Sequence, residues 1–443
     1  MNSYFEPGRE LPVVREVDVV IAGGGPAGFA AAVSAARNGA KTLLIEATNC
    51  VGGMATSGMM SHWTGGTDSP ILEEIIRRCS EMPGCEDERK DGGFKLRINH
   101  EKQKQAMFDM LEDAGAEVWL HTRAVRPVMR DGNVCGIITE SKSGREVVMA
   151  KVTIDCSGDG DIAAQTGAEF TKGREEDGLM QPVTTMFKIA GVDDERAIYP
   201  GSFESLVEVP QGEIQALARQ ELPAPAGHVL LYPSPIPGQV VVNMTNMTNI
   251  DGSDTRDLTK AEIACRKQIP LIIDFLHKYA PGYENCYVVA VAATVGVRET
   301  RHFKGLYTIT PEDIVEARVF DDWIATRNWF NFDIHSLKGP GLDPNGAQAH
   351  FKAKGKYTIP YGACVPEKIN GLLLAGRCIS GTHKAHSNFR VMPICANMGQ
   401  GIGLAAAMAA ELGVEPRDID VKSVQKSLLE QGVSAPGQTQ IER

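Results

Sequence analysis

The 443-residue sequence has no uninterrupted apolar run long enough to cross a bilayer, and its first residues, MNSYFEPGRE, lack the apolar segment of a secretory signal. Its formal net charge is −11, and no cluster of lysines and arginines stands out. These absences argue against an anionic membrane surface and against nucleic acid as partners. We therefore expect a cytoplasmic protein that binds neither membrane nor nucleic acid.

The ten cysteines are scattered and show no C-x-x-C spacing. This absence argues against an iron–sulfur cluster, and we predict no metal site. A disulfide framework is not expected either in a chain of this size without a secretory signal. Most of the cysteines are predicted to be small, reduced core residues.

Residues 17–46 carry the most informative pattern in the chain. A short apolar run leads into a glycine-rich turn, a helix of small residues and a second apolar run that ends at Glu46. In such a unit, Gly23 permits the tight turn, Gly25 lets a pyrophosphate approach the backbone, and Gly28 lets the helix pack on the sheet. Glu46 lies near the offset of an acid that binds a ribose hydroxyl. The pattern predicts a dinucleotide site, with a purely structural turn as the alternative.

A rival glycine pattern follows the apolar run at 152–156. Gly158, Gly160 and Ala163 fit the same G-x-G-x-x-A spacing. No second strand ending in an acid follows them, which disfavours a second dinucleotide domain. We predict instead that 152–156 returns to the first sheet and that residues 157–159 pass close to the same cofactor.

Hydrophobic periodicity organises the rest of the chain. Helices are predicted at 100–114, 260–279 and 392–412, and strands at 117–120, 122–129, 134–139, 146–150, 239–244 and 371–375. The mixture of elements changes after about residue 184, which indicates an inserted second domain.

Motifs at both ends of the chain resemble those of one family. Gly52–Gly53 follows Glu46 by about six residues, the return strand ends in DCSGDGD, and the last strand ends in LLLAGR. The family's further positions are matched by Ile359, Pro360, Tyr361, Ser380, His383, Ala385, Arg390, Pro393, Gly399, residues 403–407 and the segment GVRETR at 296–301. Over roughly 1–190 and 290–412, the sequence resembles FAD-dependent oxidoreductases with a glutathione-reductase-like FAD-binding domain, related to the succinate dehydrogenase and fumarate reductase flavoproteins.

The resemblance implies an α/β protein with a discontinuous Rossmann-like FAD-binding domain. Its N-terminal segment is expected at 15–183 and its C-terminal segment at 336–433. An inserted α+β substrate domain is expected at 184–335, and a mobile tail at 434–443.

The resemblance also implies which residues hold FAD. They are Gly23, Gly25, Pro26, Ala27, Gly28, Glu46, Ala47, Gly52, Gly53, Met54, Val125, Ser157, Gly158, Asp159, Gly376, Arg377 and Pro393. Pro393 suits the first turn of the last helix, whose positive end could stabilise an anionic reduced flavin. His62 lies in a segment similar to one that carries a covalently bound flavin, but a noncovalent FAD is expected.

The expected reaction is hydride transfer between flavin N5 and a small polar or carboxylate-bearing substrate. The loop after the last strand holds the predicted catalytic residues His383, His386 and Arg390, with imidazole for proton exchange and arginine for a carboxylate. Arg298 and Arg301 are further carboxylate candidates. A flavin-dependent monooxygenase and a non-catalytic flavin-binding protein are the alternatives. Oxygen or a separate electron carrier is expected to reoxidise the flavin, and a homo-oligomer is conceivable.

Overall fold

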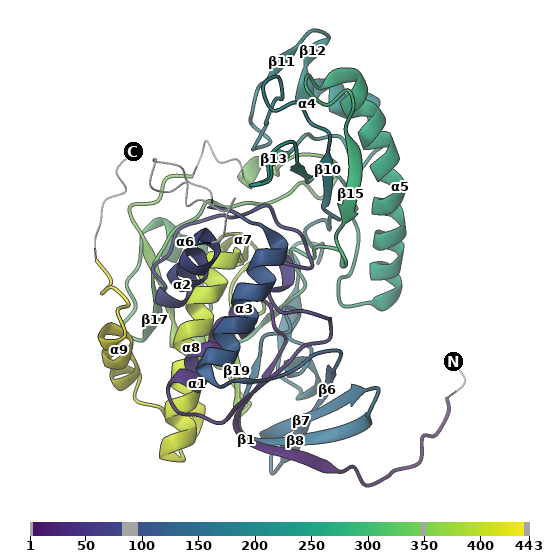
Figure 1. Cartoon of the computed structure of the whole chain (residues 1–443). Helices are drawn as coiled ribbons and strands as arrows, with labels where there is room; N and C mark the ends of the chain where they lie inside the picture. Colours follow the sequence, from purple (N-terminus) through teal and green to yellow (C-terminus); the bar gives the residue numbers. More distant parts are fainter. Residues whose placement is uncertain (1–2, 82–95, 347–350, 438–443) are drawn as a thin grey trace.

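The computed structural model describes residues 3–81, 96–346 and 351–437 (Figure 1). Its largest sheet has seven strands in the order β5-β2-β1-β8-β7-β6, with β19 also paired to β8. These strands are β1 (Val13–Ala22), β2 (Thr42–Ile45), β5 (Glu117–Trp119), β6 (Arg123–Arg130), β7 (Asn133–Ser141), β8 (Gly144–Asp155) and β19 (Leu372–Leu374). The pairs among β5, β2, β1, β8 and β19 are parallel, whereas β7 and β6 extend β8 as an antiparallel meander. The predicted Rossmann-like α/β fold is confirmed.

The strand at 152–156 does return to the first sheet, as predicted. It forms the end of β8, and the register pairs Ala22 with Asp155. The strands predicted at 146–150 and 152–156 are one continuous strand, because both segments lie along the same edge of β1.

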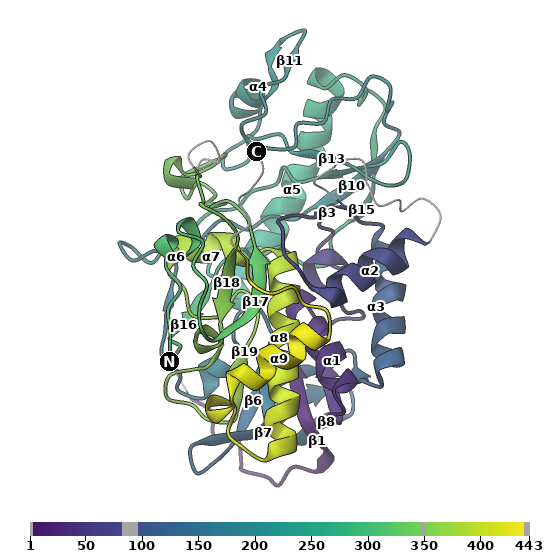
Figure 2. The same ribbon diagram turned by 90° about the vertical axis from the view of Figure 1, so that its left-hand side faces the viewer.

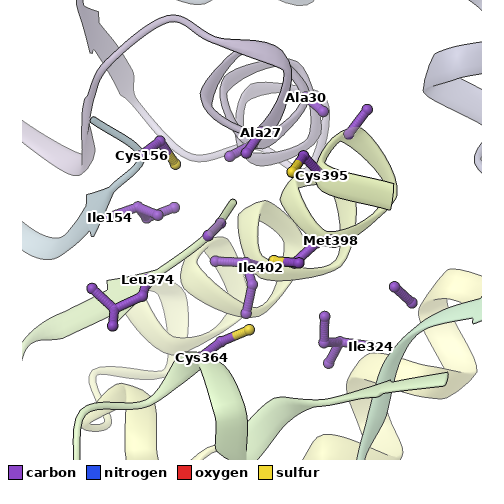
Figure 3. Close-up of a cluster of buried hydrophobic side chains, with 14 of the residues drawn as sticks. Ala27, Ala30, Ile154, Cys156, Ile324, Cys364, Leu374, Cys395, Met398 and Ile402 are labelled. Carbon is purple, nitrogen blue, oxygen red and sulfur yellow. The ribbon is translucent and has the colours of Figure 1, made fainter. Parts of the chain in front are cut away.

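Two helices of small residues form the centre of the main core. Helix α1 (Pro26–Arg37) packs against α8 (Met392–Leu412), and the two helices lie side by side in Figure 3, where Ala27 and Ala30 are labelled on α1. A Cβ atom at Gly399 would lie 2.1 Å from the carbonyl oxygen of Ala27. Only glycine at position 399 therefore allows the helices to approach so closely. Helix α8 covers residues 392–412, as predicted from the sequence.

The inserted region has its own sheet and its own core. Strands β13 (Leu231–Pro233), β14 (Val240–Val242), β10 (Phe187–Ala190) and β15 (Tyr287–Val291) form an antiparallel sheet in that order. Helices α4 (Ile214–Glu221) and α5 (Thr255–Tyr279) add their apolar faces to a core that is separate from the main one. Figures 1 and 2 place this unit at one end of the molecule.

The chain returns to the main core earlier than the predicted boundary at 335. Strand β16 (Arg301–Phe303) pairs with β9 (Phe170–Lys172), and β17 (Trp323–Asn328) pairs with β18 (Tyr357–Pro360). Phe303 and Trp323 belong to the main hydrophobic core. No motif in the sequence marks the end of the inserted sheet at β15, so the sequence placed the boundary after β16 and β17.

Further strands and α-helices lie between and after these elements. They are β3 (His62–Trp63), β4 (Leu96–Arg97), β11 (Glu208–Val209), β12 (Gly212–Glu213), α2 (Pro70–Ser80), α3 (His100–Ala114), α6 (Pro311–Val315), α7 (His383–Phe389) and α9 (Val421–Glu430). In the predicted tail, the carbonyl oxygens of Ser434 and Ala435 accept hydrogen bonds from Thr326 and Arg327. Residues 438–443 of that tail lie outside the described residues.

No single helix among residues 3–81, 96–346 and 351–437 is long and apolar enough to cross a membrane. Helices α7 and α8 meet the length and composition test only as a pair bent by 88°, and α8 is buried along nearly its whole length.

Candidate active site

The glycine turn between β1 and α1 leaves the start of α1 open. Gly25 is the N-cap of α1, no side chain caps the helix, and no acid lies in its first turn. A Cβ atom at Gly25 would meet nothing within 4 Å, whereas one at Gly28 would lie 1.8 Å from the carbonyl oxygen of Gly23. The uncapped N–H groups and the empty space at Gly25 together form a cradle for an anion such as a pyrophosphate.

The ribose-binding acid predicted from the sequence lies beside this turn. The Glu46 carboxylate accepts hydrogen bonds from the backbone N–H groups of Gly24 (2.7 Å) and Thr48 (2.8 Å). Gly52 N–H donates to the Gly24 carbonyl, so the Gly52–Gly53 doublet packs against the turn. Each carboxylate oxygen keeps a second lone pair that can accept a ribose hydroxyl. Ala47 is exposed next to Glu46.

The return strand brings a second group of predicted residues to the same place. Arg377 and Asp159 form an ion pair at 2.8 Å, and a Cβ atom at Gly158 would lie 3.1 Å from the Arg377 guanidinium. Ser157 N–H and Oγ both donate to Asp155, and Gly376 follows β19 closely. The strand ends of β1, β8 and β19 therefore meet at one edge of the sheet, which is where open α/β sheets bind ligands.

A cavity of about 1100 Å³ runs from this region to the inserted domain. Met54, Gly65, Arg377, Arg390, Val391 and Met392 line it from the main domain, and Thr184, Met186, Leu230, Tyr232 and Asn243 line it from the inserted one. Its ionisable lining comprises Arg298, Lys356, Arg377, Arg390, Asp333, His62, His335 and Tyr232. Four permanent cations face one carboxylate in a protein whose net charge is −11, so the cavity concentrates anions.

An ion cluster holds the predicted substrate arginine, Arg390, at the cavity wall. Arg390 donates to the Asp333 carboxylate at 2.9 Å and to its carbonyl oxygen at 3.0 Å, and His335 lies 3.4 Å from the same carboxylate. Burial alone would raise the pKa of Asp333, but His335, Arg390 and Arg298 lower it well below its ordinary value. Burial and Arg298 lower the pKa of His335 to about 4. The imidazole of His335 is therefore neutral near pH 7.

Arg298 is a second cation in this wall and is buried. It donates to the carbonyl oxygen of Pro182 at 2.5 Å. Burial and the nearby Arg390 lower the pKa of Arg298 to about 10, so it stays charged. Arg301 does not share this position, because it binds Asp161 and the carbonyl oxygen of Asp159 instead.

The predicted catalytic histidines do not line the cavity. Residues 383–389 form the short helix α7, capped by Thr382, rather than the loop we expected. His386 is buried, and His383 Nδ1 lies 2.6 Å from Glu299 Oε1. Of the three predicted catalytic residues, only Arg390 lines the cavity.

The remaining predicted residues have defined places. Val125 lies in β6 at the point where the register with β7 shifts, between the paired residues Ala124 and Arg126. Val125 itself has no paired position on β7. Pro393 lies in the first turn of α8, as predicted. His62 lines the cavity, its Nδ1 atom lies 2.6 Å from Ser61 Oγ, and its ring packs on Tyr232 at 4.9 Å.

Sequence reasoning missed several cavity residues. Asp333 and His335 carried no local motif, because they meet Arg390 only through the fold of the main domain, and Tyr232 joins them from the inserted sheet. Glu299 lies inside the recognised GVRETR segment and could have been selected as its one acid.

A protein-family model decides the family. The model described as "FAD dependent oxidoreductase" matches residues 18–428. The chain belongs to this family. It is therefore an FAD-dependent oxidoreductase, and the open cradle at Gly25, the Glu46 carboxylate and the cationic edge at Arg377 fit the cofactor.

Curated relatives match only parts of the chain. A digeranylgeranylglycerophospholipid reductase of Methanospirillum hungatei is 30% identical over 161 residues, which is 32% of this chain and 39% of the relative. A fumarate reductase (cytochrome) of Shewanella frigidimarina is 48% identical over 65 residues, 13% of this chain and 11% of the relative. The chain thus spans well under two thirds of the length of these relatives.

Among solved structures, a geranylgeranyl bacteriochlorophyll reductase-like protein from Thermoplasma acidophilum matches with a TM-score of 0.49 and 14% identity. The alignment covers 94% of this chain and 84% of that one.

Proposed function

We propose that this enzyme transfers hydride between flavin N5 and a small anionic substrate, most simply a carboxylate. The carrying observation is the cavity wall in which Arg298 and Arg390 lie beside one carboxylate, Asp333. Two guanidiniums next to a single acid leave a net positive charge that a substrate carboxylate can neutralise. Bound FAD would supply the hydride donor or acceptor.

The position of the cavity supports this assignment. It is bounded by Met54 and Arg377 at the FAD-binding edge and by Tyr232 in the inserted domain. A volume of about 1100 Å³ slightly exceeds that of most small-molecule sites, which span roughly 300–1,000 Å³. It therefore has room for a flavin ring and a substrate together. We propose that FAD is bound noncovalently and that Val125 supplies backbone contacts to adenine.

Proton exchange at this site is assigned to His62. His335 lines the same wall, but a base with a pKa of about 4 is poorly matched to neutral pH. His62 is oriented by Ser61 through Nδ1 and faces the cavity, so it can take up or release the proton that accompanies hydride transfer. We do not propose that His383 or His386 touches the substrate.

Reoxidation by oxygen or by a separate carrier is part of the proposal. The second glycine pattern, at 158–163, follows a strand of the first sheet and borders the same site. It therefore supports the FAD site rather than a separate nicotinamide domain.

An anaerobic screen tests the proposal. FAD-loaded protein is mixed with small carboxylates and with their neutral amides, and the flavin absorbance is followed. Bleaching by one or more carboxylates, with little effect of the amides, is expected. Reduction only by NADPH, followed by oxygen uptake with a neutral aromatic compound, would instead establish a monooxygenase. Acid precipitation should release the flavin; colour in the pellet would contradict a noncovalent link.

A further inference from the structure

A second polar cluster lies outside the residues that line the cavity. One ligand atom each from Glu299, His302 and His386 lies within 4.8 Å of the other two. All three residues are at most 4% exposed. The cluster is therefore enclosed by protein, and substrate binding does not use it.

Regular elements hold the two histidines, and Glu299 lies two residues before the first of these elements. Glu299 and His302 form an E-x-x-H pair, and His302 lies in β16, opposite Thr171 of β9. His386 lies in α7, whose N-terminus is capped by Thr382. Groups carried on a strand and a capped helix are held more firmly than groups on loops.

Two ring nitrogens in the cluster lack a hydrogen-bond partner. Within the described part of the chain, Nδ1 of His302 and Nδ1 of His386 are both enclosed and unpaired. The two rings meet edge to face, with centroids 4.5 Å apart. A buried polar atom without a partner costs about 1–3 kcal/mol. A metal ion would accept a lone pair from one nitrogen of each ring; His302 faces Glu299 through Nε2, so its Nδ1 would remain unpaired.

The carboxylate of the cluster is already oriented from outside. Glu299 Oε2 accepts a hydrogen bond from the backbone N–H of Gln181 at 2.9 Å, and Oε1 lies 2.6 Å from His383 Nδ1. Metal-binding carboxylates commonly have such outer hydrogen bonds, which fix their direction. His383 would thus orient the Glu299 carboxylate without binding the metal itself.

We propose that Glu299, His302 and His386 bind a divalent first-row transition ion, with zinc as the best fit. Two imidazoles and one carboxylate suit zinc, whereas calcium and magnesium prefer oxygen ligands alone. Zinc bonds of about 2.0–2.2 Å place tetrahedral ligand atoms about 3.4 Å apart. His302 Nε2 and Glu299 Oε1, now 2.8 Å apart, would have to separate slightly, while the other ligand pairs already lie within 4.8 Å of one another. This site departs from the expectation of no metal, which rested on cysteine spacing.

The ion has a structural role in this proposal. It links the segment that carries Arg298, the residue before Glu299, to helix α7, which leads into Arg390. Both cavity arginines are thereby anchored to one point. The competing account is that a protonated histidine neutralises Glu299, since His302 Nε2 also lies 2.8 Å from Glu299 Oε1.

The test is the metal content of FAD-loaded protein, measured by plasma mass spectrometry. The protein is produced with zinc and dialysed against metal-free buffer. One zinc per chain is expected for the wild type, with at least a tenfold lower content in Glu299→Gln and His386→Asn. His302→Asn should also lose zinc, whereas His302→Cys should retain it, because thiolate is a zinc ligand.

His277→Asn is the matched control. It removes an exposed histidine, outside the cluster, whose Nε2 lies 2.8 Å from the Cys286 carbonyl oxygen in the inserted domain, and its zinc content should equal that of the wild type. Flavin absorbance confirms that each variant is folded and loaded. A zinc-free wild type, or equal zinc in wild type and Glu299→Gln, would overturn the proposal and establish the ion pair instead.

Discussion

The nucleotide end and the cavity end of this site are built by different means. At the nucleotide end the backbone does the binding: the Gly25 cradle, the start of α1 and the Gly24 N–H that holds Glu46 all lie within one short unit. At the cavity end, side chains bind, and Arg298, Asp333 and Arg390 come from distant parts of the chain. The nucleotide end therefore depends on the local conformation of one short segment. The cavity end depends on how distant parts of the chain pack together.

The strongest way to test this contrast is Gly25→Ala. The added methyl meets nothing within 4 Å in the protein itself, so the fold should be unaffected. It would occupy the space assigned to the pyrophosphate, and FAD affinity should fall about 100-fold, or about 2.7 kcal/mol. Equilibrium dialysis with FAD measures this change. Gly362→Ala adds the same methyl with only ordinary contacts, the nearest at 3.4 Å, and should bind FAD normally.

At the cavity end, Arg390→Met should raise KM for the anionic substrate about 10–100-fold, because a charge-assisted hydrogen bond is lost. It should also lower the free energy of unfolding by about 2 kcal/mol, since the partly buried Asp333 loses a charge-assisted hydrogen bond and keeps only His335 and Arg298 nearby.

The double variant Arg390→Met/Asp333→Asn separates these two effects. It should regain most of the lost stability but none of the substrate affinity. Recovery of KM in the double variant would mean that Arg390 acts only through Asp333. Urea denaturation and steady-state kinetics supply the two readouts.

Acid should lower the free energy of unfolding because of buried histidines around the cavity. The pKa of His335 is lowered to about 4 and that of His228 to about 3, in both cases mainly by burial. Below about pH 6.5 these histidines become protonated in the unfolded chain but stay neutral in the folded protein. The free energy of unfolding therefore falls as the pH falls towards about 4. The loss should reach up to about 2 kcal/mol per histidine by about pH 5.

Urea denaturation of wild type and His228→Gln at about pH 7 and about pH 5 checks this effect. The variant should lose less stability on acidification than the wild type. Equal losses in the two proteins would show that His228 takes up its proton in the folded state.

The smallest expected effect is that of Ser61→Ala. It removes the hydrogen bond that orients His62, which should slow flavin reduction about fivefold, or about 1 kcal/mol, and shift the pH profile. FAD affinity should not change, because the nucleotide end is untouched. A matching loss of FAD affinity would show that the two ends are coupled.

Sequence patterns predicted the parts of this protein that are local. The first βαβ unit, α3, α8 and the position of Pro393 all matched, because glycine spacing and hydrophobic periodicity act within a few turns of chain. Glu46 lies beside the glycine turn, as its spacing indicated, and its contact with a ribose stays a prediction.

Long-range contacts explain what the sequence did not predict. His383 and His386 were assigned to the substrate because they lie in the recognised segment, but Glu299 and His302 draw them into a buried cluster. Asp333 reaches the cavity through long-range packing within the main domain, and Tyr232 through packing between the two domains. The sequence shows the E-x-x-H spacing of Glu299 and His302 and the H-x-x-H spacing of His383 and His386. It does not show that these two segments lie next to each other in the folded protein.

The most direct test of the central claim compares charge selectivity in two proteins. The rate of anaerobic flavin reduction is measured for a substrate carboxylate and its neutral amide, in wild type and in Arg390→Met. We expect the wild type to prefer the carboxylate by at least about tenfold, and the variant to lose most of that preference while still binding FAD. Equal preference in both proteins would contradict an anionic substrate held at the arginine wall.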